Sequence, residues 1–203
     1  MTWRNEHTAF VALGSNLGEP AAILTRAAGR MDGILPGVRL AARSRIFHSA
    51  PHELARLEYP WPEVFREGTQ GANLSPLEES HERAAARGPA PIRPATPWYA
   101  NMAVRLDCAP GITPEALFEA LMRLEAELGR NRIMENRWGP RVIDIDLLTF
   151  GNDTRSTPRL TLPHPRMTQR AFVMLPLAEI APEEVSPDIV EGLSFSASDT
   201  MLF

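Results

Sequence analysis

Two carboxylates separated by one residue, Asp144 and Asp146, stand in the apolar segment VIDIDLL. Alternate side chains of a β-strand point to the same face, so we expect both carboxylates on one face, with their Cα atoms roughly 7 Å apart. That separation suits two ligands of one metal site. An unpaired carboxylate in so apolar a strand would be costly, which predicts a metal ion or an arginine as its partner. A purely structural salt bridge is the alternative.

Four arginines precede this strand and flank a stiff Trp138-Gly139-Pro140 turn: Arg130, Arg132, Arg137 and Arg141. The planar fork of a guanidinium group suits phosphate oxygens. Together with the two aspartates, the arginines predict Mg²⁺ holding a polyphosphate, and therefore a transferase that depends on magnesium and ATP. The bracketing glycines also favour a loop that closes over a triphosphate and excludes water. A solvated loop is the alternative.

Two further groups carry polar chemistry. His164 lies between two prolines and close in sequence to Arg159, Arg166 and Arg170, which predicts a phosphate contact, with a structural histidine as the alternative. Tyr99 and Asn101 alternate along an expected strand. An aromatic plate and an amide then share a face, and the amide supplies the donors and acceptor that read the edge of a heterocycle. An ordinary strand pair is the alternative.

Composition narrows the class of protein. The chain has 203 residues, enough for one domain with a real core, and a net charge of −4, which does not mark a nucleic-acid-binding surface. Its basic residues are all arginine, which excludes a phosphate-loop lysine and a Schiff base. The single cysteine, Cys108, excludes an internal disulfide framework. No leader or membrane-length apolar run is evident, so we expect a cytoplasmic protein that binds no membrane.

Hydrophobic periodicity predicts a mixed α+β sandwich, with helices on one or both faces of a sheet. The expected strands are 8–13, 38–47, 99–106, 142–150 and a short 159–162; the expected helices are 20–31, 114–128 and 170–180. Residues 52–98 break this pattern because prolines recur throughout them. Proline at that density forbids a long helix or a continuous sheet. We interpret the segment as an insertion in a single domain spanning 1–203.

The motifs ALGSNLG, YANMAV, LGRNR with RWGPRVIDIDLL, and LPHPRMTQRAFVMLPLAEIAP together resemble the 6-hydroxymethyl-7,8-dihydropterin pyrophosphokinase family of folate biosynthesis. The resemblance runs from Thr8 to about Pro182, apart from the insertion. It implies a ferredoxin-like α+β fold with a mainly antiparallel sheet and flanking helices. It also implies transfer of the β,γ-diphosphate of ATP to the pterin hydroxymethyl group, with release of AMP and participation of two Mg²⁺ ions.

The resemblance assigns roles to individual positions. Asp144 and Asp146 match the magnesium ligands, and Arg130, Trp138 and Arg141 match catalytic positions, the last two in the closing loop. The ATP-binding positions are Glu125, Arg132, Leu147, Arg159, Thr161, His164 and Arg170. The pterin-binding positions are Ser49, Ala50, Pro51, Tyr99, Asn101 and Phe172. The partners implied are the two small-molecule substrates, and we expect a monomer.

Two other functions fit part of the pattern. Another magnesium-dependent nucleotidyl- or glycosyltransferase would use the two carboxylates, but it would not require Tyr99, Asn101 and Phe172 around one flat pocket. A non-catalytic binder of pterins or nucleotides would have no need of both aspartates, His164 and the arginines. Production of AMP that depends on the pterin separates the three.

Overall fold

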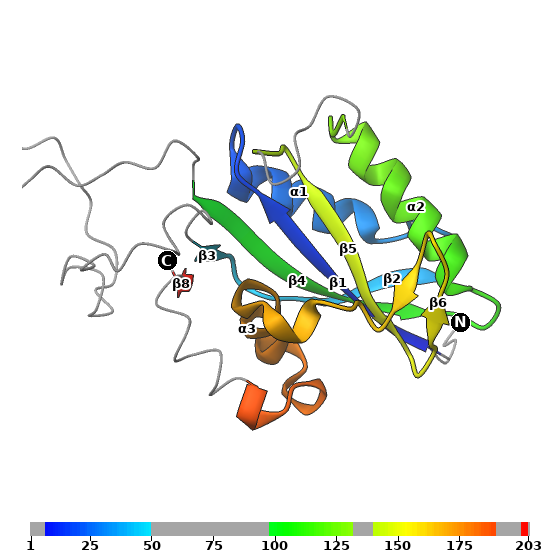
Figure 1. Cartoon of the computed structure of the whole chain (residues 1–203). Helices are drawn as coiled ribbons and strands as arrows, with labels where there is room; N and C mark the ends of the chain where they lie inside the picture. The colour runs from blue at the N-terminus through cyan, green and yellow to red at the C-terminus, as the bar shows by residue number, and fades with distance from the viewer. Residues whose placement is uncertain (1–6, 50–97, 132–139, 190–199, 203) are drawn as a thin grey trace, which may run out of the picture.

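The computed structural model describes residues 7–49, 98–131, 140–189 and 200–202, and Figure 1 shows their arrangement. The main sheet has six strands: β1 (His7–Ser15), β2 (Val38–Arg43), β3 (Phe47–Ser49), β4 (Tyr99–Cys108), β5 (Asp144–Phe150) and β8 (Thr200–Leu202). A separate two-stranded ribbon contains β6 (Arg155–Ser156) and β7 (Thr161–Leu162). Every pairing in both sheets is antiparallel.

The strand order follows the split β-α-β arrangement of ferredoxin-like folds. The order is β5-β1-β4-β3-β8, with β2 also paired to β4. The long strand β4 lies between β1 on one side and β2 and β3 on the other, so each crossover helix joins strands that are not neighbours. This confirms the predicted α+β class and the mainly antiparallel sheet.

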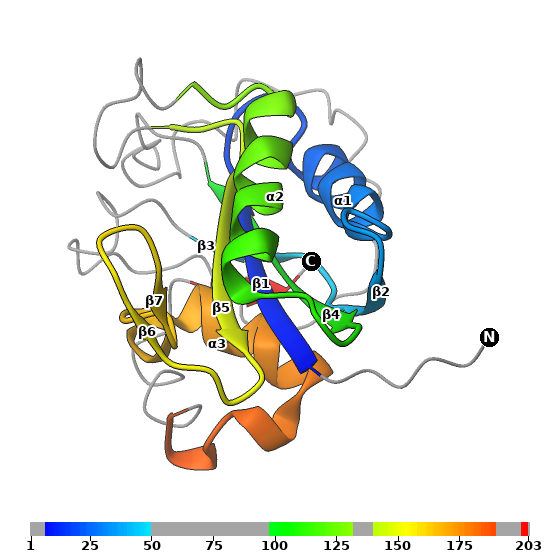
Figure 2. The same ribbon diagram turned by 90° about the vertical axis from the view of Figure 1, so that its right-hand side faces the viewer.

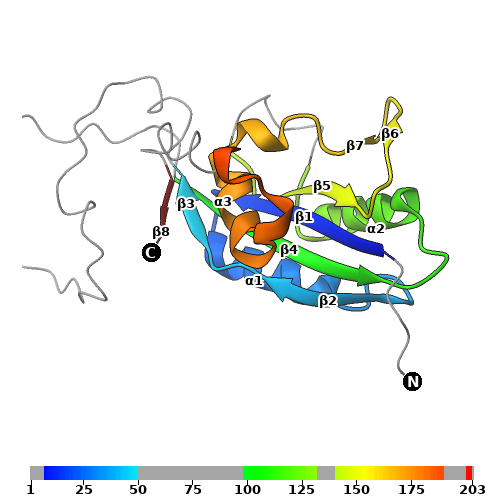
Figure 3. The ribbon, with the colours of Figure 1, turned by 90° about the horizontal axis from the view of Figure 1, so that it is seen from below.

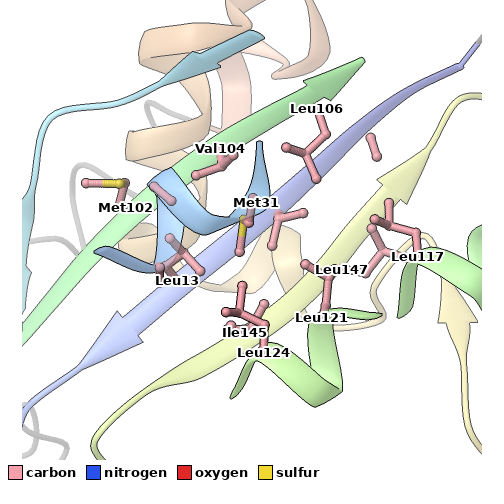
Figure 4. Close-up of a cluster of buried hydrophobic side chains, with 14 of the residues drawn as sticks. Leu13, Met31, Met102, Val104, Leu106, Leu117, Leu121, Leu124, Ile145 and Leu147 are labelled. Atoms are coloured by element: carbon pink, nitrogen blue, oxygen red, sulfur yellow. The ribbon is translucent and has the colours of Figure 1, made fainter. Parts of the chain in front are cut away.

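Helices cover both faces of the sheet (Figures 2 and 3). α1 (Pro20–Met31) and α2 (Pro114–Glu127) pack on one face over the larger core cluster, of which Figure 4 shows Leu13, Val104, Leu121 and Ile145. α3 (Ala171–Ile180) packs on the other face over a smaller cluster that includes Phe10, Ala103 and Leu148. Short 3-10 turns, Met167–Gln169 and Pro182–Glu184, flank α3. Among the described residues, none of the helices combines the length and apolarity needed to cross a membrane.

The signals at the ends of α2 act as the sequence predicts. Thr113 is the N-cap, and its side chain accepts a hydrogen bond of 3.2 Å from the backbone N–H of Ala116, while Pro114 occupies the first turn. Gly129 follows the helix with a φ of 100°, a conformation that glycine adopts readily. The chain therefore leaves α2 at a defined point, immediately before Arg130.

The prediction of a single strand over residues 38–47 is wrong, because β2 ends at Arg43 and a second strand, β3, begins at Phe47. The pairing of β2 with β4 shifts register between Leu40 and Ala42. Ser44 then bonds to Ala103 of β4, donating its backbone N–H at 2.9 Å and accepting the Ala103 N–H on its hydroxyl at 3.0 Å. β3 resumes further along β4. The break brings Ser49 opposite Tyr99.

The sequence did not predict two of the strands. One of them is β6, which pairs with β7; only β7 falls within the segment expected as a lone strand over 159–162. The other is β8, which pairs with the outer edge of β3. Both are short and have no clear alternation of apolar residues. Most of the predicted insertion, and with it the question of a single domain over 1–203, lies outside the described residues.

Candidate active site

Three neighbouring strands align Asp144, Gly14 and Asn101 in one row near the end of the sheet, and Phe47 of a fourth strand continues this row. Asp144 of β5 pairs with Gly14 of β1, Gly14 pairs with Asn101 of β4, and Asn101 pairs with Phe47 of β3. Side chains in one row of an antiparallel sheet project to the same face. That face is the one covered by α3, since Ala103, two residues along from Asn101, belongs to the cluster under α3.

The two carboxylates share this face, as predicted. Asp144 and Asp146 are partly exposed, whereas Ile145 between them is fully buried in the core on the opposite side. Asp146 pairs with Ala12 in the neighbouring strand. The strand thus uses its apolar residues for packing and presents its only two charges together.

Both oxygens of Asp144 are bound by arginine. Arg130 donates from Nη1 to Oδ1, and Arg141 donates from Nη1 to Oδ2 at 2.8 Å. Burial alone would raise the pKa of Asp144, but the charges and hydrogen bonds of the two arginines outweigh it and lower this pKa below its usual value. Asp144 is therefore ionised at neutral pH.

Asp146 faces a second pair of basic side chains. Its Oδ2 lies 3.7 Å from Nη1 of Arg170 and 4.0 Å from Nε2 of His164. Burial, followed by the positive charges of Arg170 and Arg166, lowers the pKa of His164, so the ring is neutral near pH 7. The backbone N–H of Arg166 donates to Nδ1 at 3.3 Å, which leaves the proton on Nε2, the nitrogen that faces Asp146.

Strand β5 lies at the edge of the sheet, and its outward backbone groups are bonded to residues of the site. Oε1 of the buried Glu125 accepts the Ile145 N–H at 3.0 Å and also accepts from Arg130 Nη1 at 2.6 Å. The carbonyl of Leu148 accepts the backbone N–H of His164 at 2.8 Å. Glu125 thereby joins α2, Arg130 and β5, while the Leu148 bond sets His164 beside the carboxylates.

Asn16, directly after β1, fixes the position of Arg141. The Arg141 N–H donates to Oδ1 of Asn16 at 2.8 Å, and the Asn16 N–H donates to the Arg141 carbonyl at 3.2 Å. Asn16 is only 2% exposed. Because the two residues exchange hydrogen bonds in both directions, the backbone of Arg141 is held where its guanidinium group reaches Asp144.

Replacing Asn16 by alanine is expected to lower the free energy of unfolding by about 1–2 kcal/mol, because the partly buried Arg141 N–H loses its acceptor. Exchange of the Arg141 amide hydrogen should become faster. Asn16→Asp keeps the acceptor oxygen and should retain most of the stability. Denaturant unfolding and hydrogen exchange measure both effects, with the exposed Asn152→Ala as the control. An Asn16→Ala protein that matches Asn152→Ala in both would contradict this role.

Asn101, in the same row as Asp144 and Gly14, forms a polar pair with Ser49 of β3. Asn101 is 4% exposed, and its Nδ2 donates to the Ser49 hydroxyl at 3.0 Å and to the Phe47 carbonyl at 3.3 Å. Tyr99, two residues earlier on β4, shares its face. Phe172, in the first turn of α3, is 37% exposed, and the Arg170 guanidinium carbon lies 5.7 Å from its ring centre.

Comparisons with known proteins assign the chain to a family. A family model described as 7,8-dihydro-6-hydroxymethylpterin-pyrophosphokinase matches residues 65–182. A relative from Methylorubrum extorquens, named 2-amino-4-hydroxy-6-hydroxymethyldihydropteridine pyrophosphokinase, is 36% identical over 177 residues, covering 87% of this chain and 84% of the relative. The chain belongs to this pyrophosphokinase family. A relative of the same name from Pseudomonas aeruginosa is 34% identical over 179 residues, or 88% of this chain and 83% of its own.

Solved structures agree on the fold. One described as the HPPK-DHPS in complex with substrates matches 96% of this chain with a TM-score of 0.55 and 14% identity. A triple mutant of the Plasmodium falciparum HPPK-DHPS matches 94% with a TM-score of 0.53. The pyrophosphokinase chain spans 44% of each of those two chains. At this identity the likeness supports the ferredoxin-like arrangement alone.

Three residues that the resemblance assigns to ATP are not among the side chains named above as contacting the two carboxylates. Arg159 pairs with Glu119 of α2 at 2.7 Å, and its side chain is 74% exposed. Thr161 is exposed on β7. Leu147 is 3% exposed with its side chain in the core, so a contact from it to a nucleotide would come from the backbone. Their assignments stay predictions.

The remaining predicted site residues, Ala50, Pro51, Arg132 and Trp138, lie outside the described residues. The sequence interpretation also gave no role to Asn16, although ALGSNLG was among the motifs. The available signal was a polar residue directly after a buried strand. Such a position predicts a loop, but not which backbone the side chain bonds.

Proposed function

We propose that this pyrophosphokinase carries out its reaction at the row formed by Asp144, Gly14 and Asn101. The enzyme is an ATP-dependent diphosphotransferase of folate biosynthesis that transfers the diphosphate of ATP to 6-hydroxymethyl-7,8-dihydropterin and releases AMP. The observation that carries the site is the row itself. It places Asp144 and its arginine partners at one end and the buried amide of Asn101 at the other, and Asp146 projects from the same face of β5.

The described residues fit Mg²⁺ bound together with nucleotide. They contain no cluster of three or more metal-ligating side chains, and Mg²⁺ usually takes one or two protein carboxylates and completes its shell with phosphates and water. Asp144 and Asp146 would hold the ions. Bound Mg²⁺ neutralises charge on the transferred diphosphate and polarises the attacking hydroxyl.

The basic residues bind and orient the triphosphate in this proposal. Arg130 and Arg141 now hold Asp144, and Arg170 lies near Asp146. Guanidinium groups so close to the carboxylates can turn to phosphate oxygens without a large movement of the backbone. Neutral His164 can donate a hydrogen bond from its Nε2–H to the triphosphate. Phosphoryl-type transfer asks a protein mainly for such positioning and charge neutralisation.

The pterin binds at the opposite end of the row. Asn101 orients the heterocycle by its edge, while Tyr99 and Phe172 stack on its faces, Tyr99 from β4 and Phe172 from α3. Ser49 holds the Asn101 amide by a hydrogen bond. By resemblance alone, Ala50 and Pro51 supply backbone contacts to the pterin, Arg132 binds the nucleotide, and Trp138 belongs to the loop that closes over the site. We further propose that the enzyme is cytoplasmic and acts as a monomer. Light scattering tests the oligomeric state.

The direct test is an assay for AMP. Purified protein, Mg²⁺, ATP and 6-hydroxymethyl-7,8-dihydropterin should give AMP and the pterin diphosphate in equal amounts. Omission of either substrate should abolish AMP. Sugar and nucleotide acceptors should be inert. Tight binding of both ligands without AMP would favour a non-catalytic binder, and AMP formation that ignores the pterin would favour another transferase.

Replacing Asn101 by alanine is expected to weaken pterin binding by about 1–3 kcal/mol, because polar groups of the ligand lose their partners. Affinity for a non-hydrolysable ATP analogue should remain the same. Titration calorimetry with each ligand measures the difference. Loss of both affinities together would show that Asn101 supports the fold through Ser49 and Phe47 and does not recognise the pterin.

A further inference from the structure

Gly14 occupies the middle of the row and leaves it without a side chain. A β-carbon at Gly14 would lie 3.6 Å from Oδ1 of Asn101 and 3.9 Å from Cβ of Asp144. The position therefore separates the amide assigned to the pterin from the carboxylate assigned to magnesium. It lies on the same face as both, because paired residues of neighbouring strands project together.

Neither the backbone nor the packing requires a glycine here. Gly14 is absent from the glycines with positive φ, such as Gly18 and Gly129, so an L-residue can adopt its backbone conformation. The two contacts of 3.6 and 3.9 Å are ordinary van der Waals distances. A glycine within a strand that needs neither freedom nor space for the fold often marks a place where a ligand approaches the backbone closely.

Strand spacing gives the scale of that ligand. Asn101 and Asp144 are two strands apart, so their backbones are separated by roughly 10 Å, at about 4.8 Å for each spacing. A bicyclic heterocycle that is held by its far edge at Asn101 and carries a hydroxymethyl group on its near side can bridge that interval. We propose that Gly14 is the floor beneath the bound pterin and sets the reach of its hydroxyl group toward Asp144. This inference rests on the proposed function.

A methyl group at Gly14 would stand between the two ends of the row. The ring could keep its edge contact only by tilting away from the sheet, which moves the hydroxyl away from the carboxylates. The residues that hold the triphosphate, Arg130, Arg141 and Arg170, approach the carboxylates from outside this row. Gly14 therefore determines how tightly the pterin binds and how its hydroxyl group is aligned with the carboxylates, but it does not affect nucleotide binding.

Gly14→Ala tests this proposal, with Gly29→Ala as the matched control. Gly29 lies in α1, and an added β-carbon there meets no atom within 4 Å. For Gly14→Ala, calorimetry should show pterin affinity at least about tenfold weaker, and turnover at saturating substrates should fall by about 10–100-fold, the scale of an ångström-sized misplacement. Affinity for the ATP analogue should stay within about twofold of the wild type, since no nucleotide contact changes. Gly29→Ala should match the wild type in all three.

The outcomes decide the matter. Wild-type pterin affinity and turnover in Gly14→Ala would overturn the proposal, and so would an equal loss of pterin and ATP-analogue affinity. A Gly14→Ala protein that fails to fold would also overturn it, because the glycine would then serve the fold. The wild-type protein is assayed before the variants. If it forms no AMP from ATP and the hydroxymethyl dihydropterin, the proposed function is wrong, and this result is distinct from a failure of the proposal for Gly14.

Discussion

Asp146→Ala is expected to reduce turnover by about 10³-fold or more at saturating Mg²⁺, while leaving the fold intact. Asp146 is partly exposed and lies on the opposite face of the strand from Ile145 and Leu147, which pack in the core on either side of it, so we expect the fold to tolerate the loss of its side chain. Loss of one preorganised electrostatic stabiliser costs about 10²–10³ in turnover. Loss of a metal ligand adds the cost of weaker Mg²⁺ binding. Steady-state AMP formation across a Mg²⁺ titration measures both.

Asp188→Ala is the control, since Asp188 is an exposed aspartate. It should behave as the wild type in the same titration. Near-normal turnover of Asp146→Ala at high Mg²⁺ would refute its assignment as a magnesium ligand. The midpoint of thermal unfolding, measured on both variants, separates a loss of chemistry from a loss of structure.

Glu125→Leu is expected to lower the free energy of unfolding by about 3–5 kcal/mol, the usual cost of removing one partner of a buried ion pair. The Glu125 side chain is 2% exposed and that of its partner Arg130 is 8% exposed. The substitution also leaves the Ile145 N–H without its acceptor. Denaturant unfolding measures the change, which should persist in high salt because the pair is shielded from solvent.

Two variants on the same helix calibrate this effect. Glu127→Leu removes an ion pair with Arg30 in which both side chains are about half exposed, and it should change stability by less than about 1 kcal/mol. Glu125→Gln keeps an acceptor for Ile145 and removes only the charge, so its loss should be intermediate. Equal stabilities of Glu125→Leu and Glu127→Leu would show that the buried carboxylate contributes nothing special.

Local signals in the sequence predicted the elements whose contacts are mostly local. The apolar stripe of α2, its Thr113 cap and the glycine stop at Gly129 each act within a few residues, and α1 has the predicted bounds Pro20–Met31. The alternation of charge and apolar residues in VIDIDLL likewise placed Asp144 and Asp146 on one face. Most of the helices and the carboxylate strand follow from such patterns.

Tertiary contacts decided the rest. The break between β2 and β3 depends on the bonds of Ser44 to Ala103, a residue far along the chain, and no local pattern announces it. For the same reason the partner of Asn16 could not be predicted, since it is the backbone of Arg141, 125 residues away. Glu125 is the clearest case. The resemblance assigns it to the nucleotide, and that assignment stays a prediction; its hydrogen bonds to Arg130 and to the Ile145 N–H could not be predicted from the sequence.

The edge position of β5 links activity to solubility. An open strand edge with apolar side chains is a template on which another chain can add a strand and begin aggregation. Here the outward N–H of Ile145 donates a hydrogen bond to the Glu125 carboxylate, and the outward carbonyl of Leu148 accepts one from the His164 backbone N–H. The residues that organise the site thus also block intermolecular pairing along the carboxylate strand. Selection for catalysis and selection against aggregation therefore act on the same few positions.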